Sequence, residues 1–286
     1  MSDLRALLRR HGLHPRKQMG QHFLTNPDIL GRIVAAAELV ADDVVLEIGP
    51  GLGHLTKQLA EAAGEVVAVE LDRDLVSALE RELAPFDNVQ LVQGDILALD
   101  PAELVGERAF KVVANLPYNI TSAALRHLLE ARVPPQRIVV TIQREVAERI
   151  VARDGKMSLL AVSVHFYGTP ELMFRIRPGS FYPPPAVDSA VLRIDWHGQP
   201  PVSLEEREVF FQVVRAGFSQ SRKQIRNSLA GGLQLPRERV TQALQAAGIE
   251  PRRRAERLSL TDWARLTEAL KPSICHATDH TNDRNH

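Results

Sequence analysis

Short runs of apolar residues alternate with amphipathic segments through the first half of the chain. Five of the runs have the length of a buried strand: 44–48, 66–69, 89–92, 110–114 and 138–142. Apolar side chains recur at helical spacing in four segments that follow such runs: 52–63, 74–83, 122–129 and 145–151. Repeated strand–helix units predict an α/β fold, with a parallel sheet covered by helices on both faces. Ligands of such sheets bind at the carboxyl ends of the strands.

The pattern changes in the second half. Residues 187–195 alternate apolar and polar side chains like a half-buried strand, after the stiff proline segment 183–185. Beyond the linker-like 198–201 no strand pattern appears, and four short helices are predicted: 204–217, 222–230, 236–247 and 261–270. We therefore predict an α/β domain over residues 1–200, a small all-helical domain over 201–271 and a disordered polar tail over 272–286.

Composition narrows the setting of the protein. The chain has 286 residues, 44% of them apolar, and its one cysteine, Cys275, excludes an internal disulfide framework and a multi-cysteine zinc site. No apolar run approaches the roughly 20 residues that span a bilayer, and the N-terminus lacks the apolar core of a secretion signal. These features predict a cytoplasmic protein without a membrane partner.

Charge is unevenly distributed along the chain, although the net charge is zero. Residues 27–110 carry five Lys/Arg against seventeen Asp/Glu, whereas residues 203–271 carry thirteen against eight. The acidic block is suited to receive a cation, and the basic C-terminal third is suited to meet phosphates.

A glycine-rich turn, Gly49-Pro50-Gly51-Leu52-Gly53, separates the first predicted strand from its helix. Glycines there let the backbone approach a ligand closely. Glu70 ends the next strand, where an acid can hold ribose hydroxyls, and Asp95 follows the third, where it can bond an adenine amine. The glycine spacing differs from that of dinucleotide binders, and an acidic pocket suits a sulfonium better than a pyrophosphate. The set indicates S-adenosyl-L-methionine as the cofactor.

A second motif, Asn115-Leu116-Pro117-Tyr118, follows the strand 110–114. The Asn115 carbonyl oxygen can accept an N–H of a planar amine, and the proline removes a backbone donor and fixes the turn. The Tyr118 ring offers a face on which a base can stack. This strand end is therefore predicted to hold the amino group of a nucleobase.

At these residues the chain resembles the small-subunit ribosomal RNA adenine N6,N6-dimethyltransferases of the KsgA type, from about residue 16 to 270. Three further runs carry the resemblance: Gly20-Gln21-His22-Phe23-Leu24, Phe181-Tyr182-Pro183-Pro184-Pro185-Ala186-Val187-Asp188-Ser189 and Phe218-Ser219-Gln220-Ser221-Arg222-Lys223-Gln224-Ile225-Arg226-Asn227. They resemble, in order, the family's motif that closes over the cofactor, its second substrate loop and its C-terminal helical motif. His22 departs from the family's frequent Asn, and Ser221 stands where many relatives have a basic residue.

The resemblance implies a Rossmann-like S-adenosylmethionine-dependent methyltransferase sheet and assigns residues to the site. The implied cofactor contacts are His22, Leu24, Gly49, Gly51, Glu70, Leu71, Asp95, Ile96 and Asn115. The implied catalytic and target-base contacts are Asn115, Leu116, Pro117, Tyr118 and Phe181, with Tyr118 and Phe181 sandwiching a flipped base. The implied RNA contacts are Arg222, Lys223 and Arg226, expected on one helix face. Arg252-Arg253-Arg254 is a second candidate grip, and no metal is implied.

The implied reaction is transfer of methyl groups to N6 of two adjacent adenines in a hairpin loop near the 3′ end of 16S rRNA. The substrate would be the rRNA within an immature 30S particle, the product N6,N6-dimethyladenosine, and the enzyme a monomer. Hydrogen bonds from the amine to the Asn115 oxygen and to a carbonyl near Leu116 or Pro117 would localise its lone pair, so no general base is expected.

Several alternatives stay open at this stage. A large-subunit rRNA adenine methyltransferase conferring antibiotic resistance would share both motifs, although the proline-rich run 183–189 and the basic segment near Arg222 argue against it. A DNA adenine methyltransferase and a ribosome-assembly factor that acts by binding are the others. A nicotinamide-dependent dehydrogenase is disfavoured by the glycine spacing.

Overall fold

A seven-stranded mixed sheet forms the centre of the first part of the protein. The computed structural model describes residues 2–16, 19–152, 155–220 and 222–282. Strand order in the sheet is β4-β3-β2-β5-β6-β9-β7. The five parallel strands are β2 (Val44–Ile48), β3 (Glu65–Glu70), β4 (Val89–Gln93), β5 (Lys111–Asn115) and β6 (Arg137–Gln143). The predicted α/β fold is confirmed, with each predicted strand within two residues of its observed bounds.

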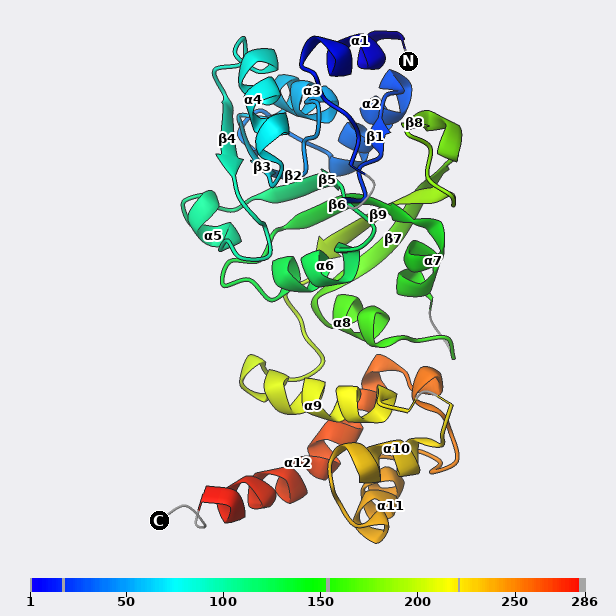
Figure 1. Cartoon of the computed structure of the whole chain (residues 1–286). Helices are drawn as coiled ribbons and strands as arrows, with labels where there is room; N and C mark the ends of the chain where they lie inside the picture. The colour runs from blue at the N-terminus through cyan, green and yellow to red at the C-terminus, as the bar shows by residue number, and fades with distance from the viewer. Residues whose placement is uncertain (1, 17–18, 153–154, 221, 283–286) are drawn as a thin grey trace. The chain divides into compact units, whose positions relative to one another are not determined.

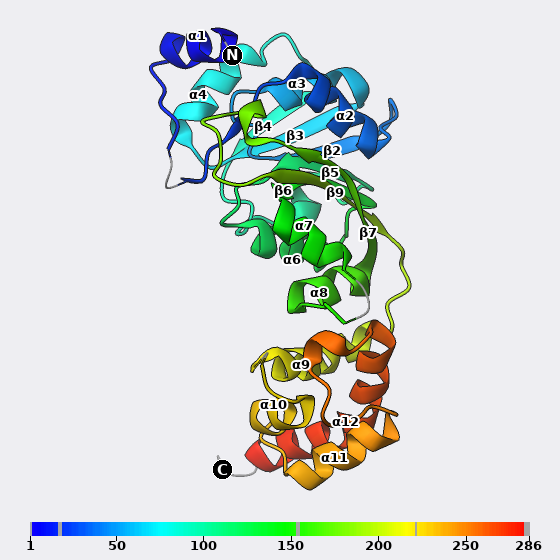
Figure 2. The same cartoon turned by 90° about the vertical axis from the view of Figure 1, so that its right-hand side faces the viewer.

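Helices cover both faces of this sheet, as Figures 1 and 2 show from two directions. One face carries α2 (Pro27–Ala37), α3 (His54–Ala62) and α4 (Arg73–Glu82). The other carries α5 (Pro101–Leu104), α6 (Thr121–Leu129) and α7 (Arg144–Val151). The core lies between sheet and helices, where Leu30, Ile33 and Leu59 pack against Val45 and Val113. Burial of this apolar surface is the main force that holds the layers together.

An antiparallel hairpin completes the sheet. The strand predicted at 187–195 is β9 (Ser189–Trp196), and it pairs with both β6 and β7 (Gly168–Ile176). The sequence gave no prediction for β7, whose register with β9 is interrupted between Leu172 and Phe174. Such an irregularity shifts side chains from one face to the other and removes the alternation that reveals a strand.

The N-terminal segment pairs with a distant part of the chain. Helix α1 (Ser2–Arg10) precedes the two-residue strand β1 (Phe23–Leu24), which pairs antiparallel with β8 (Phe181–Tyr182) after the short 3-10 helix η2 (Pro178–Ser180). Apolar residues of α1 pack against Phe23, Leu52 and Leu75. The N-terminal segment is therefore built onto the glycine-rich turn.

The rest of the chain forms a second compact unit of helices. It comprises Arg149–Tyr167 and His197–His286, and the first unit comprises Met1–Glu148 and Gly168–Trp196. Its helices are α8 (Leu159–Tyr167), η3 (Leu204–Glu206), α9 (Arg207–Phe218), α10 (Ile225–Gly232), α11 (Arg237–Ala246), η4 (Ala255–Arg257) and α12 (Leu260–Asn282). The sequence had placed 149–167 in the first domain. The structure groups it with the second because Phe166 packs on Phe210 and Phe211, with ring centroids 4.9 Å apart in both pairs.

Two helix predictions in this unit are wrong. The helix predicted over 222–230 begins only at Ile225, so Arg222 and Lys223 precede it. The helix predicted to end before Pro272 continues through that residue to Asn282, so most of the predicted disordered tail is helical, and 283–286 lie outside the described residues. A proline removes a single backbone N–H, and the residues after it still bond to one another. Within the described residues no helix has the length and apolar character needed to cross a membrane.

Candidate active site

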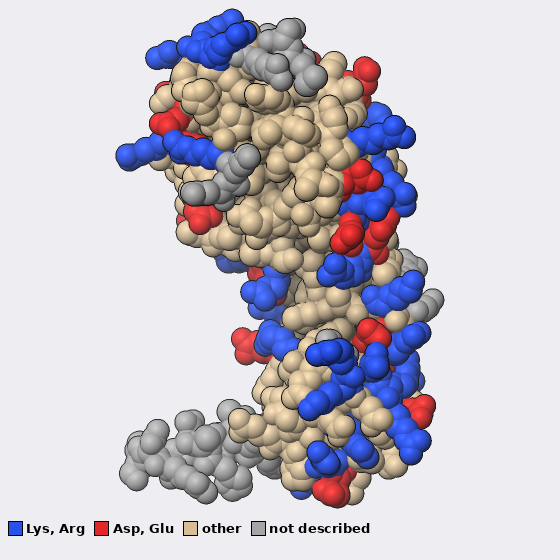
Figure 3. Space-filling model, turned by 45° about the vertical axis from the view of Figure 1, so that its right-hand side comes forward, with Lys and Arg blue, Asp and Glu red and all other residues tan. Residues whose placement is uncertain are grey.

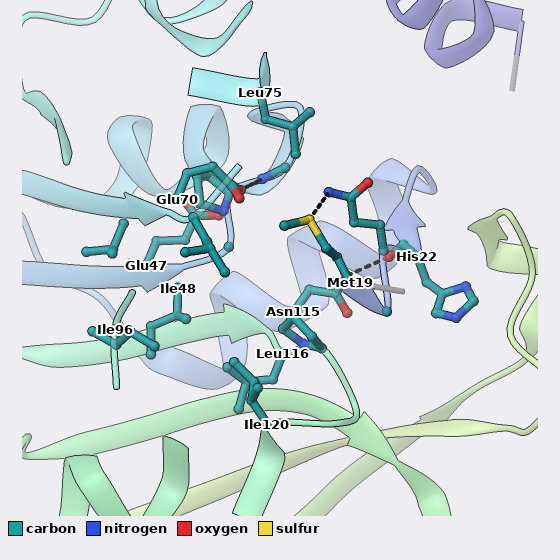
Figure 4. Close-up of a pocket in the computed structure, with 18 of the residues that line it drawn as sticks. Met19, His22, Glu47, Ile48, Glu70, Leu75, Ile96, Asn115, Leu116 and Ile120 are labelled. Carbon is teal, nitrogen blue, oxygen red and sulfur yellow. Dashed lines mark hydrogen bonds between the residues drawn. The ribbon is translucent and has the colours of Figure 1, made fainter. Parts of the chain in front are cut away.

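A cavity of about 330 Å³ opens at the carboxyl ends of the parallel strands (Figure 4). Strands β2, β3 and β5 each deliver residues to it because the ends of neighbouring parallel strands lie at one edge of the sheet. Twelve residues predicted from the sequence line it: His22, Leu24, Gly49, Gly51, Glu70, Leu71, Asp95, Ile96, Asn115, Leu116, Pro117 and Tyr118. The structure thus brings both predicted motifs to one space.

The glycine-rich turn has backbone angles that favour glycine. Gly49, Gly51 and Gly53 have φ of 66°, 62° and 79°. A Cβ on Gly49 would meet no atom within 4 Å, whereas one on Gly51 would lie 2.9 Å from the Phe23 ring. Gly49 therefore leaves space beside the backbone for a ligand, and Gly51 leaves space for the N-terminal segment to close on the turn.

Glu70 fastens this turn to the end of β3. The carboxylate accepts hydrogen bonds from the backbone N–H of Gly51 at 3.2 Å and of Asp72 at 2.9 Å. The side chain is buried, and burial raises the pKa of Glu70 above its usual value. Each oxygen accepts one of these bonds, which leaves lone pairs for the hydroxyls of a ribose.

The far end of the cavity has one acidic and two apolar residues. Asp95 is exposed, and its Oδ1 accepts the backbone N–H of Leu97 at 3.0 Å, so the carboxylate both caps a turn and lines the cavity. Leu71 is 55% exposed and Ile96 is buried. An exposed leucine beside a buried isoleucine at a cavity wall forms an apolar surface suited to a flat aromatic ring.

Glu47 is a site residue that the sequence prediction missed. It lines the cavity from β2 and is 1% exposed, and its Oε2 has no hydrogen-bond partner among the described residues. Burial raises the pKa of Glu47 to about 8, and the neighbouring Glu70 carboxylate adds to the rise. The available signal was a charged residue in an otherwise apolar strand, Val44–Ile48. A buried carboxyl with an unbonded oxygen can accept a cationic ligand group.

The N-terminal segment closes one side of the cavity. Met19 and His22 line it, and Figure 4 shows both beside Asn115. The segment is tied to the residues after β3: Arg16 bonds Asp72 at 2.8 Å, and Gln21 donates to Asp72 at 3.0 Å. Asp72 is buried, so these charge-assisted bonds are well shielded from water.

Asn115 is held in one orientation. Its Nδ2 donates to the backbone carbonyl of His22 at 2.8 Å, which leaves Oδ1 as the acceptor. The Pro117 carbonyl already accepts from the Ile120 N–H at 3.2 Å and the Thr121 hydroxyl at 3.3 Å. Among the described residues none donates to the carbonyl oxygen of Leu116. The two acceptors that this loop offers are therefore Asn115 Oδ1 and the Leu116 carbonyl.

Tyr118 is fixed next to these acceptors. Its hydroxyl lies 2.6 Å from Ser189 Oγ, and its ring stacks on His22 with centroids 5.7 Å apart and 28° between the planes. His22 Nδ1 donates to the Pro183 carbonyl at 2.7 Å, so this imidazole engages the target loops through its Nδ1 and ring. In Figure 4 the ring points away from Glu70.

Comparison with known proteins identifies the family. The ribosomal RNA adenine dimethylase family model matches residues 12–271. The chain is 45% identical over 276 residues to Ribosomal RNA small subunit methyltransferase A of Dehalococcoides mccartyi, covering 96% of this chain and 95% of that protein. Identity to the protein of the same name from Moorella thermoacetica is 45% over 277 residues, covering 93% and 96%. The chain belongs to the ribosomal RNA adenine dimethylase family.

Solved structures agree with this assignment. The 23S rRNA methyltransferase ErmE is 31% identical with a TM-score of 0.70, covering 87% of this chain and 99% of that one. A dimethyladenosine transferase from Plasmodium falciparum is 24% identical with a TM-score of 0.76, covering 88% and 98%, and supports the fold. This rRNA adenine dimethylase is an S-adenosylmethionine-dependent enzyme, as predicted.

The cavity of this dimethylase fits its cofactor. The open side of Gly49 accommodates a ligand close to the backbone, and Leu71 and Ile96 provide an apolar wall for an adenine ring. Glu47 and Glu70 place two carboxyl groups near a molecule that carries a positively charged sulfonium. Among the described residues no group of three or more His, Cys, Asp or Glu side chains is arranged to hold a metal ion.

Phe181 is the predicted target residue that the structure does not bring to the cavity. It is 2% exposed and belongs to the core cluster that includes Leu24 and Leu30. Its strand β8 pairs with β1, with Phe181 opposite Leu24. An aromatic ring this buried offers no face to a base, so in this structure Phe181 supports the strand pair instead of completing a sandwich with Tyr118.

The predicted RNA contacts lie in the helical unit of the dimethylase and do not line the cavity. Arg222 and Lys223 are exposed, and Arg226 is half-buried. Since Arg222 and Lys223 precede α10, the expected common helix face with Arg226 does not exist. Ser221, the other departure from the family pattern, lies outside the described residues.

Proposed function

We propose that this dimethylase transfers methyl groups from S-adenosylmethionine to N6 of two adjacent adenines in a hairpin loop near the 3′ end of 16S rRNA. The product would be N6,N6-dimethyladenosine, formed on the rRNA of an immature 30S particle during ribosome biogenesis. The enzyme would act in the cytoplasm as a monomer. The names of the two relatives at 45% identity favour the small subunit. The pair of free acceptors at Asn115 and Leu116 is the observation that carries the chemistry.

The difficulty of the reaction lies in the adenine amine, whose lone pair is delocalised into the ring. The bond from Asn115 Nδ2 to the His22 carbonyl keeps Oδ1 available to accept one N–H of the amine. The Leu116 carbonyl accepts the other. With both protons held, the lone pair is directed out of the base plane, toward the cofactor end of the cavity. Such preorganised acceptors need no reorientation as charge develops on the nitrogen.

The cofactor supplies an electrophilic methyl group, and the protein supplies position. Holding two reactants in line contributes up to roughly 7–11 kcal/mol in well-oriented systems. Glu70 and the glycine-rich turn fix one reactant from β2 and β3, and the 115–118 loop fixes the other from β5. The amine becomes acidic only after alkylation, so no side chain is assigned as a general base.

The helical unit supplies a candidate RNA surface. The turn 251–254 packs against the start of α10, where Ile225 N–H donates to the Arg253 carbonyl at 2.7 Å and Arg226 N–H donates to the Pro251 carbonyl at 3.4 Å. These bonds bring the two basic runs that the sequence suggested, 222–226 and 252–254, into one surface. Figure 3 shows Lys and Arg side chains gathered over this unit on the face in view. Phosphate groups are the ligands that such a surface fits.

The decisive experiment is incubation of the protein with labelled S-adenosylmethionine and under-methylated small subunits, followed by mass spectrometry of the labelled nucleoside. We expect N6,N6-dimethyladenosine at two adjacent positions. Asn115→Ala should lower turnover at least about 100-fold, the size of losing a preorganised hydrogen-bonding group, with the cofactor dissociation constant nearly unchanged. Near-normal turnover by this variant would contradict the assigned role of Asn115.

The large subunit is the second candidate substrate because ErmE, at 31% identity, shares the fold over 87% of this chain. The same assay with protein-free 23S rRNA separates the two possibilities. Label on 23S rRNA and none on small subunits would overturn the proposed substrate, while leaving the adenine chemistry intact.

A further inference from the structure

Ser189 is buried beneath the target loop and takes part in neither cofactor binding nor the pair of acceptors. It begins β9 and lies opposite Gln143 of β6 in the sheet register. The side chain is 0% exposed, and its hydroxyl lies 2.6 Å from that of Tyr118. This distance is short for an O–H···O bond, which indicates a well-formed contact.

The Tyr118 hydroxyl needs such a partner. The side chain is half-buried, and burial raises the pKa of Tyr118 above its usual value, so the phenol stays neutral and keeps its proton. A buried tyrosine hydroxyl without a partner is costly, and Ser189 satisfies it. The bond therefore fixes the outer end of the ring.

One face of the same ring is also fixed. His22 stacks against it, and the imidazole is itself held by the Pro183 carbonyl. With Ser189 at its hydroxyl and His22 on one face, Tyr118 retains little freedom to rotate about its side-chain bonds. The other face is then the one left for a stacked base, three residues from Asn115.

We propose that Ser189 is a positioning residue for methyl transfer: its bond to the Tyr118 hydroxyl sets the plane on which the target adenine stacks. The inference rests on the proposed function, because it assumes that a base lies on Tyr118. Ser189 acts only through the tyrosine hydroxyl, so its effect should vanish when that hydroxyl is absent. A serine important only for packing would not show this dependence.

A double-mutant cycle tests this dependence. Single-turnover methyl transfer to under-methylated small subunits is measured for wild type, Ser189→Ala, Tyr118→Phe and the double variant. Each single change should slow transfer about tenfold, the size of one lost hydrogen bond, and the double variant should be no slower than either single one. The cofactor dissociation constant should stay within about twofold, since no cofactor contact is altered.

Ser163→Ala is the matched control. Ser163 is another buried serine, 3% exposed, and its hydroxyl donates to the Leu159 carbonyl at 3.0 Å within the helical unit. This variant removes the same atom from a buried site remote from Tyr118 in the contact network, and its transfer rate should match wild type. A comparable slowing in Ser163→Ala would show that loss of any buried hydroxyl has this effect.

Three results would overturn the inference: losses in the double variant that multiply, a parallel weakening of cofactor binding in Ser189→Ala, or full activity of Tyr118→Phe. The last keeps the ring and tests the hydroxyl even if Ser189→Ala fails to fold. Failure of the proposed function is distinguishable, because the wild-type protein would then transfer no methyl group to small subunits, and the inference would fall with it.

Discussion

Glu47→Gln should stabilise the cofactor-free protein, and the gain should grow with pH. Burial raises the pKa of Glu47 from 4.5 to about 8. A carboxyl group whose folded pKa lies above its unfolded pKa binds more protons in the folded state, so stability falls as pH rises between these two values. The penalty is absent below the unfolded pKa and fully present above the folded one. Glutamine has a similar shape and no charge to bury, so it escapes the penalty.

The size of the effect follows from the two pKa values. Each unit of pKa difference corresponds to about 1.4 kcal/mol, so the full penalty is of the order of 5 kcal/mol at alkaline pH. Between about pH 6 and about pH 8 the wild type should lose roughly 2 kcal/mol relative to Glu47→Gln. That change is a large fraction of the stability of an ordinary domain.

Urea unfolding of both proteins without cofactor at several pH values between about 6 and 9 measures the difference. Glu65→Gln is the control: Arg108 bonds lower the pKa of Glu65, so its loss should destabilise the protein by an amount that hardly varies over this range. Wild-type and Glu47→Gln curves that stay parallel at all pH values would refute the reasoning.

The same carboxyl group should couple cofactor binding to proton release. A cationic ligand beside Glu47 favours the ionised form, so binding at neutral pH should expel up to about one proton. Calorimetry in buffers of different ionisation enthalpy counts the protons. Glu70 remains in Glu47→Gln, so the difference between the two proteins isolates Glu47. Equal proton release by wild type and variant would exclude Glu47 from this coupling.

Three further changes test other parts of the site. Gly51→Ala should cost about 1–3 kcal/mol of stability, because its φ of 62° is strained for alanine and the new Cβ meets the Phe23 ring at 2.9 Å; thermal unfolding checks this against Gly49→Ala, which shares the strain and lacks the clash. Arg16→Ala should weaken cofactor binding about tenfold by releasing the N-terminal segment, with transfer at saturating cofactor preserved; calorimetry showing unchanged affinity would contradict that role. Arg222→Ala should weaken binding to small subunits and reduce its salt dependence, and an unaltered salt slope would count against a phosphate contact.

Much of the first unit could be predicted from sequence because its signals are local. Strands such as Val44–Ile48 are continuous apolar runs of the right length, and parallel strands end at one edge, so residues that follow them must meet. This rule alone placed Gly49, Glu70 and Asn115 around one cavity. Their chemistry, an acidic pocket beside a loop that accepts an amine, then indicated the cofactor and the kind of target.

The tertiary structure decided whatever depends on partners distant in the chain. Strands of two residues, such as β1 and β8, have no periodicity to detect, and they form because 23–24 and 181–182 pair. That pairing buries Phe181, which the sequence had assigned to the base. The choice between the carbonyls of Leu116 and Pro117 likewise depended on which one the start of α6 had already engaged.

The amino-acid sequence by itself thus determined the order of strands and helices, the cofactor turn and the amine-binding loop, because each is written in neighbouring residues. Only the folded chain decided that Glu47 is buried with an unbonded oxygen and that Ser189 meets Tyr118. Burial and long-range hydrogen bonds are properties of the surroundings of a side chain, and those surroundings come from segments that the local pattern does not specify.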